Sequence, residues 1–356
     1  MCGVGINVRH IYVTIILVVF AALVSCNSGS SEGGSTKADR SSLPSVTGRN
    51  GEVLVVINDD VKRDTSGVYL RAMLTESFVG LSAPEPLFDM TTIPAAYLDN
   101  LMKTFRNMLV VEVDASLKSD TVHFYNDVWA YPQAYVLVQS RSKAALLKTL
   151  QDNHIKILSY LVKSERDRLI SYDKKIKNVA LSDEIGKKWG IEITVPNLFT
   201  RCKPVDSNDL SWVRIDTDEY QCALMVYDFP YIGEGSLSKE YILDKRDKLL
   251  RKNVGGPAGS YMCTEIRYGL DEIVYKSGTH NGMQVAELRG LWRMEGYAMG
   301  GPFVLRAHYD AENSRVIVTD GYVYYPSREK KRNLLRQLEA IMYTIQVKGK
   351  DTSNQN

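Results

Sequence analysis

Apolar runs rich in β-branched residues alternate along this chain with segments of helical periodicity. The first half has strand-like runs at residues 52–57, 107–114, 121–125 and 134–139. A helix is predicted between the first two runs, where Leu70, Met73 and Leu74 recur at helical spacing. A second helix is predicted over residues 142–152, and Asn153 is expected to cap a third, longer one.

The second half is richer in strands. Its strand-like runs cover residues 191–195, 212–216, 222–227, 261–267, 273–275, 284–294, 303–310 and 315–325. Ser182 is predicted to begin a helix that Gly190 closes, and Ser238 and Ser327 are predicted to cap two later helices. Strands in runs, with helices between the runs, predict an α+β fold with mainly antiparallel sheets flanked by helices.

The N-terminus has the pattern of a bacterial lipoprotein signal. A basic residue, Arg9, precedes an apolar run at residues 11–24, shorter than the roughly 20 residues of a membrane-spanning helix. The run ends in Leu-Val-Ser-Cys at residues 23–26, which resembles the motif at which lipoproteins are cleaved and acylated. We therefore predict that residues 1–25 are removed and that Cys26 carries a diacylglycerol and an acyl chain such as palmitate. An ordinary signal peptide or an uncleaved anchor is the alternative.

The residues after the signal predict a spacer and a location. Residues 26–50 are dominated by Ser, Gly and Thr, so we expect the lipidated Cys26 to be followed by a flexible tether. By resemblance to the sorting rule of Gram-negative lipoproteins, Asn27 indicates the outer membrane, and the scarcity of acidic residues after Cys26 favours its periplasmic face. The rest is expected to form two α+β halves of similar size and a disordered tail, at residues 51–180, 181–348 and 349–356.

Composition is that of a globular protein and excludes several classes. The 356 residues are 44% hydrophobic and 24% charged, which excludes collagen-like and fully disordered proteins. The 44 basic and 42 acidic residues give a net charge of +2. This balance argues against a nucleic-acid partner, because such binding needs a clustered basic face. The expected partners are the membrane, through the lipid on Cys26, and an envelope protein.

Cysteine and histidine spacing offers no metal or redox motif. The histidines that follow the signal each stand alone in the sequence: His123, His154, His280 and His308. No zinc-binding histidine pair and no Cys-x-x-Cys occurs, so neither a metal nor another cofactor is predicted. Either Cys202 and Cys222 form a disulfide, or these two and Cys263 are buried thiols.

The segment RGLWRMEGYAMGGPF, residues 289–303, holds the candidate binding residues. Aromatic, Met and Arg side chains are concentrated in binding surfaces, and glycines let another group approach the backbone. One hypothesis is an anion-binding surface formed by Arg289, Trp292, Arg293, Met299 and Phe303. The alternative, which we favour, is a bulged strand and turn with Trp292 in the core.

Several stretches together resemble one family. They are the lipid-attachment motif at residues 23–26 and the segments RNMLVVEV, WAYPQAYV and RGLWRMEGYAMGGPF. As a set they are similar to the DUF4837 family of lipid-anchored Bacteroidota proteins, and we expect the resemblance to run from about Glu52 to Val347. It implies no activity and no residue role beyond the lipid attachment. The second half, from Trp189 and Pro196 onward, is also similar in element order to the PsbP and Mog1 type of fold, which implies a binding or assembly module.

The sequence leaves three hypotheses about function. The leading one is a non-catalytic, lipid-anchored cell-envelope protein that serves as a binding or assembly module. An envelope hydrolase is the alternative, with a site whose polar residues meet only in the folded chain, so whether the protein is an enzyme stays open. A small-ligand-binding lipoprotein is the third, and it predicts an apolar cavity between the two halves.

Overall fold

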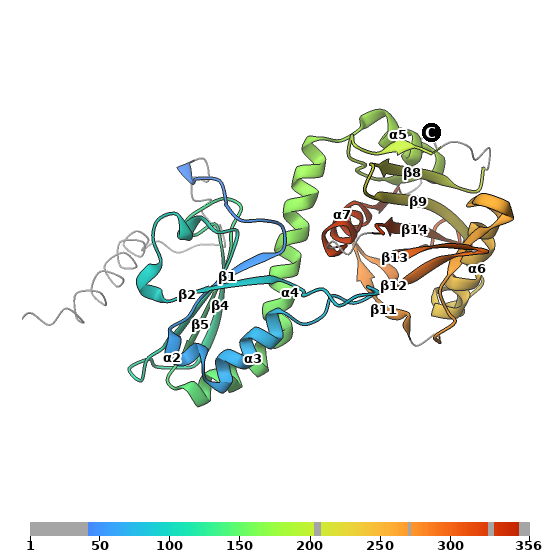
Figure 1. The fold of residues 1–356 in the computed structure, drawn as a ribbon. Helices are drawn as coiled ribbons and strands as arrows, with labels where there is room; N and C mark the ends of the chain where they lie inside the picture. Colours follow the sequence, from blue (N-terminus) through green and yellow to red (C-terminus); the bar gives the residue numbers. More distant parts are fainter. Residues whose placement is uncertain (1–41, 203–207, 270–271, 327–330, 349–356) are drawn as a thin grey trace, which may run out of the picture. The chain divides into compact units, whose positions relative to one another are not determined.

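The computed structural model describes residues 42–202, 208–269, 272–326 and 331–348 (Figure 1). The predicted signal peptide, Cys26, Ser327 and the predicted tail at 349–356 lie outside these ranges. From Leu43 onward the chain groups into one unit by its internal contacts. Within the described ranges, no helix combines the length and the hydropathy that a membrane crossing requires.

The first half is built on a sheet with the strand order β2-β1-β3-β5-β4. Its strands are β1 (Glu52–Val56), β2 (Asp89–Ile93), β3 (Asn107–Val113), β4 (Thr121–Asn126) and β5 (Ala134–Ser140). β1 pairs in parallel with β2 and β3, β3 pairs in parallel with β5, and β4 pairs antiparallel with β5. Helices α2 (Asp59–Lys62) and α3 (Thr65–Leu74) return the chain between β1 and β2, which lets these two strands run in parallel. β2 has the sequence DMTTI, which the apolar pattern does not predict as a strand.

The central strands of this sheet are buried on both faces. Val53 and Val55 pack with residues of α3 and of α4 (Lys143–Lys175), whereas Leu54 and Val56 belong to a second cluster. Successive side chains of a strand point to opposite faces, so each set belongs to one side of the sheet. A continuous apolar run such as EVLVV is typical of a strand covered on both sides.

The long helix α4 corrects the prediction of two helices over this region. It runs without a break from Lys143 to Lys175, and Ser142 caps it by accepting a hydrogen bond from the Ala145 N–H at 3.1 Å. Asn153 does not cap a new helix, because its side chain donates back to the Thr149 carbonyl at 2.9 Å. The apolar stripe continues past Asn153, and no Gly or Pro interrupts it, so nothing ends the first segment.

The predicted tether at residues 26–50 is too long at its C-terminal end. The Val46 N–H donates to the Tyr131 carbonyl at 3.2 Å, and the Thr47 N–H donates to the Thr104 carbonyl at 2.9 Å. The Tyr131 N–H in turn donates to the Pro44 carbonyl at 2.9 Å. Residues 44–47 therefore belong to the folded first half, where polar and small residues can still pair through their backbone.

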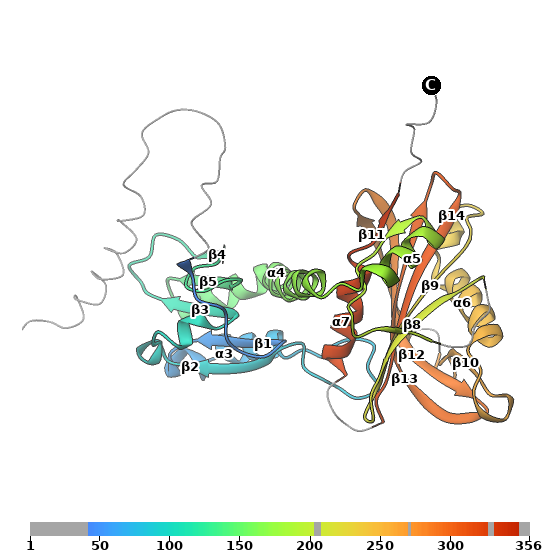
Figure 2. The same ribbon diagram turned by 90° about the horizontal axis from the view of Figure 1, so that it is seen from above.

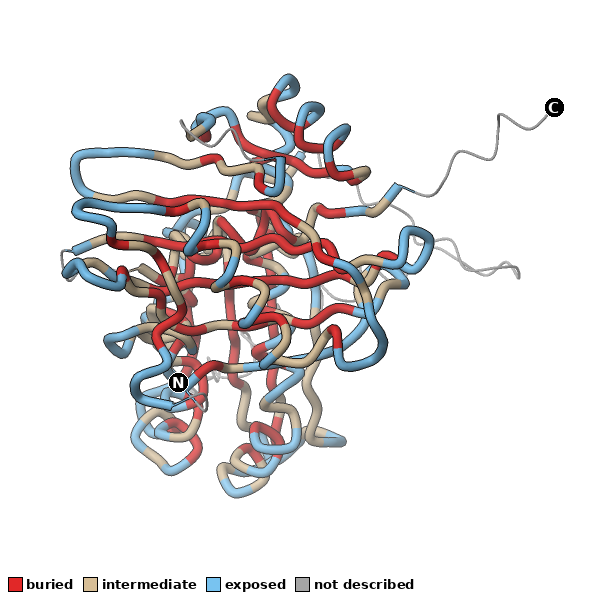
Figure 3. The backbone as a smooth tube through the Cα atoms, turned by 90° about the vertical axis from the view of Figure 1, so that its right-hand side faces the viewer, coloured by how far each residue is buried: buried red, intermediate tan, exposed pale blue. Residues whose placement is uncertain are grey.

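The second half is built on an antiparallel sheet with the strand order β10-β12-β13-β14-β9-β8-β7, and β11 pairs with β12. Its strands are β7 (Thr200–Arg201), β8 (Ser211–Asp216), β9 (Gln221–Pro230), β10 (Tyr261–Thr264), β11 (Val274–His280), β12 (Met283–Glu295), β13 (Tyr297–Asp310) and β14 (Arg315–Tyr324). The α+β class with mainly antiparallel pairing is confirmed for the chain as a whole. In Figure 3 the buried strands lie side by side, and exposed turns join their ends.

Helices α6 (Lys239–Asn253) and α7 (Arg332–Met342) cover opposite faces of this sheet (Figure 2). Asp320 on β14 pairs with Arg246 of α6, whereas the next residue, Gly321, lies against Leu338 of α7. Neighbouring strand residues point to opposite faces, so the two helices must lie on different sides. As predicted, Ser238 caps α6, by accepting from the Tyr241 N–H at 3.3 Å.

Helix α5 (Val179–Trp189) begins earlier than predicted. Asn178 caps it, whereas Ser182 lies inside the helix and accepts a hydrogen bond from the Val195 N–H at 3.0 Å. Gly190 ends the helix with a φ of 62°, as predicted. The predicted strand at 191–195 is only β6 (Ile191–Glu192), which pairs with β15 (Gln346–Val347).

The start of α7 is capped by a residue of the first half. The Lys331 and Arg332 N–H groups donate to the Glu85 carboxylate at 2.8 and 2.9 Å. A carboxylate at a helix N-terminus satisfies unpaired N–H groups and complements the helix dipole. Ser327, the predicted cap, lies outside the described residues.

Short 3₁₀ turns and free thiols complete the description. The 3₁₀ turns are η2 (Ala95–Tyr97), η3 (Met102–Thr104), η4 (Glu234–Leu237) and η5 (Pro257–Gly259). Cys202, Cys222 and Cys263 are free, so the Cys202–Cys222 disulfide does not form here. Cys222 is buried and the other two are partly buried, which fits small apolar side chains.

Candidate functional site

Two of the candidate residues from segment 289–303 lie in the core. Trp292 is 2% exposed, and its Nε1 donates to the Val323 carbonyl at 3.2 Å. Phe303 is fully buried, with the Arg246 guanidinium 4.0 Å from its ring centroid. Neither side chain is available to a partner, so the favoured interpretation, a strand with Trp292 in the core, describes this segment.

The other three candidates do not form a shared surface either. Arg289 is buried in ion pairs with Glu287, at 2.7 Å, and with Glu339. Arg293 pairs with Glu295 at 2.5 Å, and Met299 packs against the second-half core. Both arginines already have carboxylate partners, so neither is free to meet an external anion. Cys26, the predicted lipid site, lies outside the described residues.

A different site emerges where the end of α4, α5, β6, the β11–β12 turn and the segment after α7 meet. These elements line a hollow of about 820 Å³. Its charged lining residues are Lys163, Arg166, Lys174, Lys177, Lys187, Lys348, Asp167, Asp183 and Glu192. We call it the basic hollow, because six cations face three carboxylates and give a net charge of +3 with His280 neutral.

Most cations of the basic hollow have no carboxylate partner. Lys163 pairs with Asp167 at 2.5 Å, and Lys177 lies 4.0 Å from Asp183. Among the described residues, no ion pair involves the remaining four, Arg166, Lys174, Lys187 and Lys348. Unpaired charges of one sign along a concave surface concentrate the field and attract ligands of the opposite sign.

The Tyr343 ring lies between two guanidinium groups at the wall of the basic hollow. The Cζ atoms of Arg166 and Arg306 lie 3.7 and 3.6 Å from the ring centroid. Two groups this close cannot share one face of the ring, so they stack on opposite faces, where cation–π attraction holds them. The His280 ring meets Tyr343 edge-on, with 5.0 Å between centroids. Two positive charges are thus held on opposite faces of one aromatic ring.

Arg306 is the buried member of this arrangement. It is 3% exposed, and its Nε lies 3.6 Å from the Glu287 carboxylate. Its Nε and Nη1 have no hydrogen-bond partner among the described residues. Burial lowers the pKa of Arg306, and the charge of Arg166 across the ring lowers it further. Burial, followed by the charges of Arg306 and Arg166, also lowers the pKa of His280, so this ring is neutral at pH 7.

The sequence contains only part of the signal for this site. Residues 163–168 show as a run of charges, which is most simply read as a solvated face of a helix. Arg306 and Tyr343 give no signal at all, because they lie on a strand and after a helix more than a hundred residues away. Only the folded chain brings Arg166, Arg306 and Tyr343 onto one ring. The described residues contain no group of three or more His, Cys, Asp or Glu side chains that could hold a metal ion.

Comparison with known families divides the chain into two parts. Residues 178–344 match DUF4837, a domain of unknown function, and residues 46–172 match a second one, DUF8532. The predicted resemblance to DUF4837 is therefore confirmed for the second half, but its expected start at Glu52 is wrong. The resemblance can begin as late as residue 178 because each half has its own sheet and its own core clusters.

Solved structures similar to this chain cover less than half of it, at low sequence identity. The Ran-binding protein Mog1p of Saccharomyces cerevisiae has 13% identity and a TM-score of 0.29, over 44% of this chain and 90% of that chain. LpqN of Mycobacterium tuberculosis, a protein involved in cell envelope biogenesis, has 13% identity and a TM-score of 0.27, over 45% of this chain and 83% of that chain. No curated protein matches. The basic hollow combines residues from the part that matches DUF4837 with Lys163, Arg166 and Asp167 from the part that matches DUF8532.

Proposed function

We propose that this protein is a lipid-anchored component of the cell envelope that binds an acidic surface of an envelope protein through the basic hollow, without catalysing a reaction. The observation that carries the proposal is the set of four cations of the basic hollow that have no carboxylate partner among the described residues, one of which, Arg166, stacks on the Tyr343 ring. Desolvating a like-charge cluster is unfavourable unless an opposite charge accompanies it. An acidic partner supplies that charge and is attracted over a distance before contact.

The anchor is the second part of the proposal, and it rests on the Leu-Val-Ser-Cys motif at residues 23–26. A diacylglycerol with an additional acyl chain buries many methylene groups, at about 0.8 kcal/mol each. Such an anchor holds the protein stably at a membrane. We place it at the periplasmic face of the outer membrane, where an envelope partner would meet the basic hollow.

Charge reversal at the rim of the basic hollow tests the binding. The variant Lys174→Glu/Lys187→Glu changes two exposed lysines and shifts the net charge of the lining from +3 to −1. We expect about a tenfold or larger loss of the partner crosslinked in cells through a photoreactive residue at position 346. The matched control is Lys156→Glu. Lys156 is an exposed lysine of α4, the helix that carries Lys174, and it does not line the hollow. Equal crosslinking in the double variant and the control would contradict the proposal.

Removal of the lipidated thiol tests the anchor separately. We expect Cys26→Ala to remain unlipidated and to leave the membrane fraction, because alanine offers no thiol at the position that the lipid-attachment motif places for acylation. The measurement is metabolic labelling with an alkyne-tagged fatty acid, followed by fractionation with detergent. Cys263→Ala is the control and should keep both the label and the membrane fraction. Retention of the Cys26 variant at the wild-type level would refute the anchor.

A further inference from the structure

A second cavity, of about 320 Å³, lies along the last turns of α4. Its walls are largely apolar, with Leu169, Ile176, Phe199, Ile215 and Ile341 among the lining residues. They come from α4, from the segments around β7 and β8, and from α7. The volume is at the lower end of the range for small-molecule sites, about 300–1,000 Å³. An apolar cavity of this size suits a ligand with a compact apolar body.

One carboxyl group stands out in this cavity. Asp173 lines it and is only 7% exposed. No described residue forms a hydrogen bond or an ion pair with its side chain. Burial raises the pKa of Asp173 to about 7. A largely buried carboxyl group without a donor is unfavourable, since it has lost part of its hydration and received no partner in return.

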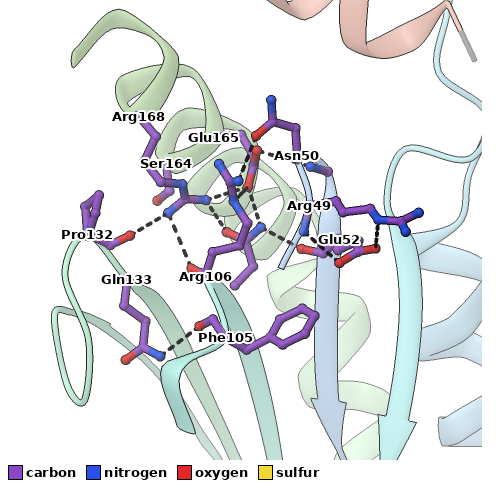
Figure 4. Close-up of polar contacts among 12 residues, drawn as sticks. Arg49, Asn50, Glu52, Phe105, Arg106, Pro132, Gln133, Ser164, Glu165 and Arg168 are labelled. Atoms are coloured by element: carbon purple, nitrogen blue, oxygen red, sulfur yellow. Dashed lines mark hydrogen bonds and ion pairs between the residues drawn. The ribbon is translucent and has the colours of Figure 1, made fainter. Parts of the chain in front are cut away.

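The two arginines at the polar end of the cavity already have a carboxylate partner within the protein. Arg106 and Arg168 line it, and both donate to the Glu165 carboxylate, at 3.0 and 2.6 Å (Figure 4). Asn107 also donates to Glu165, at 2.6 Å, so this carboxylate is fully used by the protein. Asp173 therefore differs from Glu165: both are buried carboxylates of α4, but only Glu165 has protein partners.

We propose that this cavity binds a small ligand with an apolar body and an ammonium head group, and that the ammonium pairs with Asp173. The apolar walls hold the body, and the head group supplies the hydrogen-bond donor that Asp173 lacks. The neighbouring arginines disfavour a second cation at the other end, so the ligand carries its charge at one end only. This site is separate from the basic hollow and does not depend on the proposed envelope partner.

The test uses the full chain after the signal and a matched series of probes. 2-Phenylethylamine, 2-phenylethanol and 3-phenylpropanoate share an apolar body and differ in the head group. Titration calorimetry and ligand-observed NMR measure their binding. We expect the amine to bind most tightly, the alcohol weakly and the carboxylate not at all. Equal binding of the amine and the carboxylate, or no binding of the amine up to its solubility, overturns the proposal.

Two variants locate the binding. Asp173→Asn removes the charge but not the shape, and we expect it to weaken amine binding by about tenfold or more. Leu198→Trp fills the cavity from an exposed position, so the fold should tolerate it, and we expect it to abolish binding of the amine and the alcohol alike. Asp152→Asn, at an exposed residue of the same helix that lines neither cavity, is the control and should bind like the wild type. Unchanged binding in both cavity variants overturns the proposal.

Discussion

Replacing Asp320 with alanine is expected to lower the free energy of unfolding by about 3–5 kcal/mol. Asp320 and Arg246 are both fully buried, and the Arg246 Nε donates to the Asp320 carboxylate at 2.7 Å. The guanidinium also donates to Thr264 Oγ1 at 2.8 Å and stacks on Phe303. Removing the carboxylate leaves this buried charge without its closest counter-ion, since the Asp247 carboxylate lies farther away, at 3.7 Å, and this is the main cost.

The double variant Arg246→Met/Asp320→Leu separates an uncompensated charge from a general packing defect. Two apolar side chains remove both charges, so we expect the double variant to recover much of the loss. Asp244→Ala is the control, because this exposed residue of α6 forms an exposed ion pair with Lys248 and its loss should change stability by less than about 0.5 kcal/mol. Urea unfolding at neutral pH measures all three. A loss at Asp320→Ala no larger than that of the control would show that the pair is not buried as described.

Trp292→Ala is expected to lower the free energy of unfolding by about 3–5 kcal/mol. The Trp292 ring packs edge-on against Tyr322, with 5.2 Å between centroids. Truncation opens a large cavity beside Tyr322 and leaves the Val323 carbonyl without the Nε1 donor. Both effects act on the folded state, and neither involves a partner.

A control from the same hairpin distinguishes core packing from a surface role. Tyr297 is 52% exposed, so Tyr297→Ala should keep nearly all of the stability. Thermal and urea unfolding measure both variants, and crosslinking in cells measures the partner. If Trp292→Ala kept its stability but lost the partner, the surface hypothesis would replace the core assignment. If it loses stability and Tyr297→Ala does not, Trp292 is a core residue.

The local sequence predicted the elements wherever side-chain periodicity decides them. The runs 52–57, 107–114 and 315–325 are strands β1, β3 and β14 with almost the expected bounds. Ser142, Ser238 and Gly190 mark helix ends because capping depends on groups within a few residues. The predicted break within α4 fails for the same reason: Asn153 could cap a helix only if the helix had ended before it.

The sites depend on groups that the sequence separates. Glu85 caps α7, Arg306 stacks on Tyr343 together with Arg166, and Asp173 faces a cavity formed with α7. Each of these contacts joins positions that no periodicity or spacing relates. The candidate surface in segment 289–303 shows the converse, since its residue types suit binding but its strand turns Trp292 and Phe303 inward.

The sequence by itself determined most of the strands, most helix ends, the α+β class and the prediction of a lipid on Cys26, because these follow from interactions within a few residues. Only the tertiary structure decided the parallel order of the first sheet, the pairing of residues 44–47 with the first half, and which charged groups stay unpaired. Whether a charge is a solvated helix face or part of a binding site depends on what the fold places opposite it. For Arg166 and Asp173, that depends on segments far along the chain.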